Sequence, residues 1–187
     1  FTAFFVLFLF VALFSALVPL IGGVLQVALL PLLSLGFMIA TRQSLDGRLP
    51  LPRVFVEPLR SGARGLRAML MLGVVYAVAS VAIITVSEWA DGGALDQLME
   101  VLADGKATPA DVSERLGDPR LALGLALRFG LAGLLAIPFW HAPALVHWGA
   151  QGAPQSLFSS TVAIWRNRGA FFVFALGWAA VVLTAGA

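Results

Sequence analysis

Long apolar runs set the strongest limit on how this chain can fold. Five predominantly apolar stretches recur along it, at about 1–18, 24–41, 66–87, 121–149 and 169–187. About 20 such residues suffice for a helix to cross the roughly 30 Å of hydrocarbon in a bilayer. Within hydrocarbon, only helices and closed barrels satisfy every backbone polar group. The runs predict an all-α, polytopic transmembrane bundle with five membrane helices in one domain, 1–187.

Composition supports a membrane protein and excludes some other classes. Hydrophobic residues make up 60% of the chain and charged residues 12%, whereas charged residues are about 25% of a soluble domain. The net charge of +2 provides no concentrated basic face, so we expect no nucleic-acid partner. The chain has no cysteine, which removes disulfides, thiolate chemistry and Cys-based metal sites.

The turns between the runs carry breaker residues. Gly22 and Gly23 follow Pro19, which predicts a tight turn at 19–23 between the first two helices. The first run lacks the basic flank of a signal peptide, so we interpret it as a membrane helix. Because the chain begins and ends inside apolar runs, we expect a fragment of a longer protein with a sixth helix after Ala187.

Three segments between the runs differ in charge. Residues 42–67 hold six arginines and only two acids, and residues 150–168 add two arginines and no acid. Residues 88–120 hold eight acids and three basic residues. Since Lys and Arg are retained on the cytoplasmic side, we expect 42–67 and 150–168 to be cytoplasmic and 88–120 to lie outside.

Short amphipathic helices are predicted at both surfaces. In 58–67, Arg60, Arg64 and Arg67 fall on one helical face, as a collar that fixes topology or as a site for anionic lipid or phosphate. On the acidic side, apolar spacing predicts a helix in 93–105. Thr108 and Asp111 form a capping pattern for a second helix, and Asp118 caps the fourth membrane helix.

The fourth membrane helix should bend and lead into a surface elbow. Pro138 and Pro143 crowd the preceding turns of the helix. From Pro154, a further amphipathic segment is predicted along the inner surface, with Phe158 on its apolar side and Ser156 on its polar side. Together with the arginine collar, this elbow gives the predicted interaction and lipid surface: Arg60, Arg64, Arg67, Trp148, Phe158, Trp165, Arg166 and Arg168.

The same stretches carry a resemblance. "LLSLGFMIATRQSLDG" followed by "PLRSGARGLRAMLMLG", and "FWHAPALVHWG" followed by "SLFSSTVAIWRNRGAFF", resemble an uncharacterised family of bacterial multi-pass inner-membrane proteins with about six helices. The resemblance covers nearly the whole chain and implies a fold and a location in the bacterial inner membrane, with 88–120 periplasmic. It implies no activity, and the absent last helix is where this sequence departs from the family.

Candidate chemistry is sparse. No catalytic group, metal site or cofactor is predicted. His141 and His147 are about 240° apart around one helix, so both could not hold one metal ion. Either could be an axial ligand to a haem or chlorin beside the neighbouring tryptophans, but we interpret both as interfacial histidines bonded to backbone or lipid.

One cation lies well inside an apolar run. Arg128 can snorkel toward the outer surface or form a structural ion pair with Glu88, at the outer end of the third helix. A role as a relay or coupling residue is the alternative. The ion pair is our prediction.

These features predict binding rather than chemistry. Apolar helices with glycine seams suit a non-catalytic accessory or structural subunit that binds other membrane proteins, for example of a respiratory or photosynthetic complex, or lipids. A small-molecule or lipid transporter is the alternative, because Pro31 and Pro138 would break two helices. The expected partners are membrane lipids and other integral membrane proteins.

Overall fold

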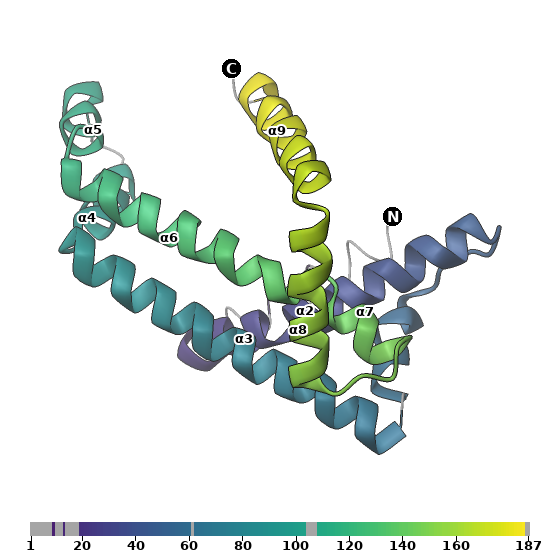
Figure 1. Ribbon diagram of the computed structural model, residues 1–187. Coiled ribbons are helices and arrows are strands. Elements are labelled where there is room, and N and C mark those ends of the chain that lie inside the picture. Colours follow the sequence, from purple (N-terminus) through teal and green to yellow (C-terminus); the bar gives the residue numbers. More distant parts are fainter. Residues whose placement is uncertain (1–8, 10–12, 14–18, 61, 104–107, 186–187) are drawn as a thin grey trace.

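The computed structural model describes residues 9, 13, 19–60, 62–103 and 108–185 (Figure 1). Within these residues it is helical and contains no strand, which confirms the all-α prediction. The elements are α2 (Pro19–Leu45), η1 (Pro52–Phe55), η2 (Glu57–Arg60), α3 (Gly62–Asp91), α4 (Ala94–Ala103), α5 (Pro109–Leu116), α6 (Pro119–Phe139), α7 (Ala142–His147), α8 (Ala153–Arg166) and α9 (Arg168–Ala185).

Four helical segments in the described part are long and apolar enough to cross a membrane. They are Gly22–Leu45, Gly62–Asp91, Pro119–His147 and Arg168–Ala185. These segments correspond to the second through fifth predicted runs. The first predicted helix, 1–18, lies outside the described residues apart from Leu9 and Leu13.

The main core lies where the two arginine-rich segments meet. We call this the Arg-rich end of the molecule (residues 42–67 and 150–168). Buried side chains from α2, η1, α3, α7 and α8 form one cluster there, including Leu35, Val54, Leu72, Val146 and Ala153. The cluster fixes the ends of the long helices relative to one another.

Close helix crossings depend on glycine. At Gly73 of α3, an added Cβ atom would lie 2.5 Å from the backbone oxygen of Ala28 in α2. At Gly36 of α2, the ring of Phe55 fills the space that a side chain would need. Small residues therefore let α2, α3 and η1 approach closely, as they do between membrane helices in general.

The opposite end, which we call the acidic end (residues 88–120), is capped by α4 and α5. Leu98 of α4 packs with Leu121 of α6 in a second, smaller core. The capping box predicted at Thr108 is confirmed, because its N–H donates to the Asp111 carboxylate and its hydroxyl accepts from the Asp111 N–H. The Thr108 hydroxyl also donates to the Asp111 carboxylate, and this bond, together with the one from the Thr108 N–H, holds the pKa of the Asp111 carboxyl below its usual value. Asp118 caps α6 as predicted.

Two predictions about the N-terminal half were wrong. Residues 19–23 belong to α2 rather than to a turn. Pro19 is the first residue of α2 in the described part. Residues 58–67 do not form one helix, since η2 ends at Arg60 and α3 begins at Gly62, whose φ is 77°. The positive φ at Gly62 ends the 3-10 turn before α3 begins.

The apolar face of α8 is exposed, as the predicted interaction surface requires, but its small-residue face is buried against protein rather than turned to water. Ala153, Ser156 and Ser160 are buried, whereas Phe158 and Trp165 are 71% and 69% exposed. Small polar residues line the contact with α6 and α7, and the large apolar residues point away from the protein. In hydrocarbon or at its boundary this orientation is favourable, because close packing and interhelical hydrogen bonds hold helices together there.

Candidate functional site

The predicted bend in the fourth membrane helix is a complete break. α6 ends at Phe139 and α7 begins at Ala142. The N–H of His141 would normally donate to the carbonyl of Ile137, four residues earlier. Instead, it donates to the Ser160 hydroxyl at 3.0 Å, and that hydroxyl donates to the Ile137 carbonyl oxygen at 3.1 Å. Ser160 of α8 therefore bridges the backbone groups that the break separates.

This bridge also explains why α8 packs with its polar face inward. A buried backbone group without a partner costs roughly 1–3 kcal/mol, and water is scarce inside a membrane helix bundle. Ser160 is fully buried, so its hydroxyl replaces the missing solvent. Sequence analysis missed Ser160. Its signal was the small-residue spacing of Ala153, Ser156 and Ser160, which is typical of a helix-packing face.

The break also positions the start of α9. The Trp140 ring makes edge contacts with Phe171 and Phe174, at centroid distances of 5.7 and 5.9 Å. The ring of His141 meets Phe171 at 5.9 Å. Three helices, α6, α8 and α9, therefore meet at this short non-helical segment.

The two candidate histidines have different surroundings. His141 is the N-cap residue of α7, and its backbone N–H is held by Ser160. His147 ends α7, with its ring 5.6 Å from the Trp148 ring. Among the residues that the structure describes, no cluster of three or more His, Asp or Glu side chains is present.

The predicted interaction residues occupy several elements. Phe158 and Trp165 point outward from α8, and the Arg168 guanidinium lies 5.8 Å from the Trp165 ring centroid. Arg166 is exposed at the end of α8. Trp148 lies instead against Arg42, at 5.5 Å from guanidinium carbon to ring centroid.

The arginine collar is exposed but spread over two elements. Arg60 ends η2, whereas Arg64 and Arg67 lie in the first turns of α3. All three side chains are exposed. They do not form the single helical face that the sequence spacing predicted.

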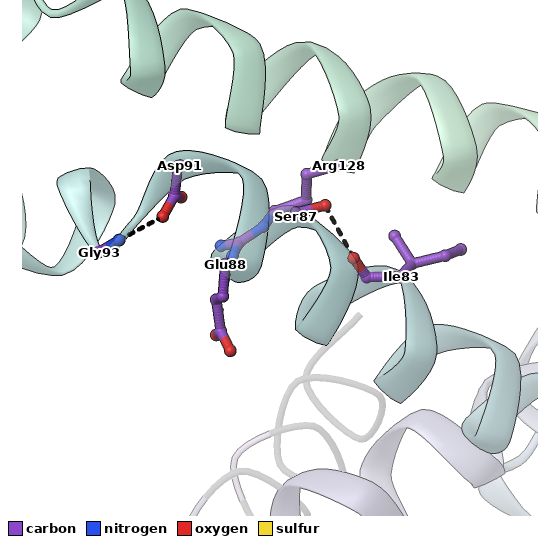
Figure 2. Close-up of polar contacts among 6 residues, drawn as sticks. All are labelled: Ile83, Ser87, Glu88, Asp91, Gly93 and Arg128. Atoms are coloured by element: carbon purple, nitrogen blue, oxygen red, sulfur yellow. Dashed lines mark hydrogen bonds and ion pairs between the residues drawn. The ribbon is translucent and has the colours of Figure 1, made fainter.

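Polar side chains line the crossing of α3 and α6 near the acidic end (Figure 2). Ser87 and Asp91 of α3 are buried, and Asp91 lies against Gly124 of α6, where an added Cβ would be 2.5 Å from the Asp91 Cβ. The Asp91 carboxylate accepts a 2.7 Å hydrogen bond from the N–H of Gly93. The hydroxyl of Ser87 donates to the carbonyl of Ile83.

The structure also brings the predicted ion pair together. Arg128 Nη2 lies 3.8 Å from Glu88 Oε1, across α6 and α3. The Arg128 side chain is 26% exposed and the Glu88 side chain 50%. The Nε atom of Arg128 is buried and has no hydrogen-bond partner in the described part of the chain. At this exposure, the pair contributes about 0–1 kcal/mol to stability.

A comparison with known proteins places the chain in a family. It is 33% identical, over 184 residues, to a protein of Burkholderia thailandensis named a probable inner membrane protein. The match covers 98% of this chain and 67% of that protein. The chain belongs to this inner-membrane protein family. This confirms the resemblance that the sequence suggested.

The family membership identifies a membrane protein without assigning an activity. No protein-family model matches the chain, and no solved structure does. The apolar helices agree with an inner-membrane location. The comparisons therefore assign no activity to the chain.

For this inner-membrane protein we predict that Ser160→Ala will lower the free energy of unfolding in detergent by about 1–3 kcal/mol, because two buried backbone groups lose their partner. Ser159→Ala is the matched control, since Ser159 is the neighbouring serine of α8 and is only half-buried. Denaturant titration followed by circular dichroism measures both. Equal stability of the two variants would contradict the bridging role.

A second prediction concerns the ion pair. Arg128→Ala and Glu88→Ala should each destabilise the protein, and the double variant should lose less than the sum of the two. A coupling energy of about 0.5–1 kcal/mol is expected for a partly exposed pair. The free energies of unfolding of the native protein, the two single variants and the double variant, measured in the same detergent, give this coupling energy. Strictly additive losses would show that the two charges do not interact.

Proposed function

We propose that the chain is a non-catalytic accessory subunit that binds another integral membrane protein through the lateral surface of α6 and α9. The observation that carries the proposal is a small-residue seam on α6 that no described helix covers. Ala122, Ala126 and Gly130 are exposed at intervals of four residues. This spacing places them on one helical face.

Three glycines on α6 show how the seam differs from a surface that already packs against another helix. Gly124 is buried against Asp91 of α3. At Gly130 and Gly133, an added Cβ atom would meet no heavy atom within 4 Å in the described part. Small residues at regular spacing let the backbones of two membrane helices approach closely. The open seam on α6 therefore suits a helix from another protein.

The second contact surface is α9. None of its residues is buried, and in Figure 1 it extends away from the paired helices α3 and α6. In the described part, its side chains contact Trp140, His141 and Trp165, and these contacts come from its first two turns. Ala175 and Ala179 are two small residues, four positions apart, on the part of α9 that follows these contacts. An apolar helix held at one end can pack along a partner.

The outer face of α8 suits lipid rather than protein. Phe158 and Trp165 are exposed there beside Arg166 and Arg168. Aromatic rings and arginines together are typical of the boundary between headgroups and acyl chains. The same face would hold the subunit at a fixed depth while α6 and α9 contact the partner.

The broken helix α6–α7 is the observation that favours the alternative, a transporter. Transporters use such breaks to expose backbone groups to a substrate. Here the Ser160 hydroxyl already forms hydrogen bonds with the His141 N–H and the Ile137 carbonyl oxygen. The break therefore serves packing of α8, and accessory binding is the better-supported function.

We predict that Ala126→Leu combined with Gly130→Leu will release a stoichiometric membrane-protein partner, because leucine side chains fill the seam. Ala82→Leu is the matched control. Ala82 is an exposed alanine of α3 and does not belong to the seam on α6. Purification of the full-length protein from its native membrane in mild detergent, with mass spectrometry, measures partner retention.

The seam variant should keep its helical content and unfolding midpoint, because no described side chain contacts these positions. Two results would contradict the proposal. One is the same set of co-purifying proteins, in the same stoichiometry, for the seam variant and the native protein. The other is saturable movement of a solute by the purified protein in vesicles.

A further inference from the structure

A polar cavity lies at the Arg-rich end, where α2 ends. It measures about 210 Å³ and lies between the last turn of α2, the following turn, η2 and Trp148. Its polar lining consists of Arg42, Gln43, Asp46, Arg48 and Glu57. Unlike the apolar surfaces of α6 and α9, this cavity presents both positive and negative groups.

Of the four charged side chains that line the cavity, two form a salt bridge with each other and two have no salt-bridge partner in the described part. Arg48 and Asp46 form a salt bridge of 2.8 Å and neutralise each other. In the described part of the chain, no salt-bridge partner lies within 4.0 Å of the Arg42 guanidinium or the Glu57 carboxylate. The cavity therefore offers one cation and one anion that have no salt-bridge partner in the described part and do not pair with each other.

The aromatic wall orients the cation. The Arg42 guanidinium lies 5.5 Å from the Trp148 ring centroid, which restricts the side chain to one side of the cavity. Arginine presents several N–H donors in a planar fork, and this geometry matches phosphate oxygens. Glu57, on η2, supplies a carboxylate that can accept hydrogen bonds from an ammonium group.

We propose that this cavity binds the phosphoethanolamine headgroup of a membrane phospholipid. Arg42 contacts the phosphate and Glu57 contacts the ammonium group. A headgroup with both charges satisfies both free side chains, whereas a phosphate alone would leave Glu57 facing a second anion.

The location and size of the cavity agree with a headgroup. Arg42 lies in the last turn of α2, at the end of a segment apolar enough to cross a membrane. Arginine and tryptophan at such an end lie at headgroup depth. The volume is below the ~300–1,000 Å³ of pockets for whole drug-sized ligands, so the acyl chains would remain outside in the bilayer.

This site is independent of the proposed partner binding, since none of its lining residues lies on α6 or α9. The test uses the full-length protein in detergent, titrated with short-chain phosphatidylethanolamine, short-chain phosphatidylglycerol or soluble O-phosphoethanolamine. Native mass spectrometry counts the bound molecules and gives the dissociation constants. The variants are Arg42→Gln and Glu57→Gln, with Arg53→Gln as the matched control, because Arg53 is exposed on η1 but does not line the cavity.

We expect saturable binding of phosphatidylethanolamine at one site, in preference to phosphatidylglycerol. Arg42→Gln should weaken binding of both lipids about tenfold or more, because a charge-assisted hydrogen bond contributes roughly 1.5–3 kcal/mol. Glu57→Gln should weaken phosphatidylethanolamine alone and abolish the preference. Arg53→Gln should bind as the native protein does.

Three results would overturn the proposal. They are no saturable phosphatidylethanolamine binding, an equal effect of Arg42→Gln and Arg53→Gln, and an unchanged lipid preference in Glu57→Gln. Soluble O-phosphoethanolamine that binds as tightly as the lipid, with the same response to the variants, would support the charge recognition and identify the free phosphoester as the ligand.

Discussion

A helix in hydrocarbon must satisfy its own backbone hydrogen bonds, and this constraint organises the structure around residues 137–160. Where α6 breaks, the carbonyl of Ile137 and the N–H of His141 lose each other as partners, and the hydroxyl of Ser160 binds both. α8 must therefore pack with its small polar face inward, which directs Phe158 and Trp165 outward. One serine hydroxyl thus determines both the packing of α8 and the character of its free surface.

The other contacts between helices gather at the two ends of the molecule. At the Arg-rich end, a core of apolar side chains holds α2, α3, α7 and α8 together, and the polar cavity lies beside it. At the acidic end, α4 and α5 cap the α3–α6 pair, where Asp91 and Arg128 lie near the crossing. Between the ends, the sides of α6 and α9 remain open in the described part. Their openness is the basis for the proposed accessory function.

Sequence patterns predicted the features that depend on local chemistry. Hydropathy located the long helices, the cap at Thr108 followed from its spacing to Asp111, and proline placement predicted a disturbance near Pro138. The features that sequence analysis missed depend on contacts between distant elements. The orientation of α8 required knowledge that Ser160 meets Ile137, 23 residues away, and the cavity required knowledge that Trp148 meets Arg42. Amphipathic spacing alone would turn the serine face of α8 to water, because it assumes that polar side chains point there.

The Arg-rich and acidic ends should lie on opposite sides of the inner membrane, with the acidic end outside. Since this chain contains no cysteine, a cysteine introduced at the exposed Ala110 in α5 can be labelled selectively. A second variant, with cysteine at the exposed Leu49, reports the Arg-rich end. In cells with a permeabilised outer membrane, an impermeant maleimide should label Ala110→Cys, and should label Leu49→Cys only after the inner membrane is disrupted. The reverse pattern, or labelling of both variants in intact inner membranes, would contradict the account.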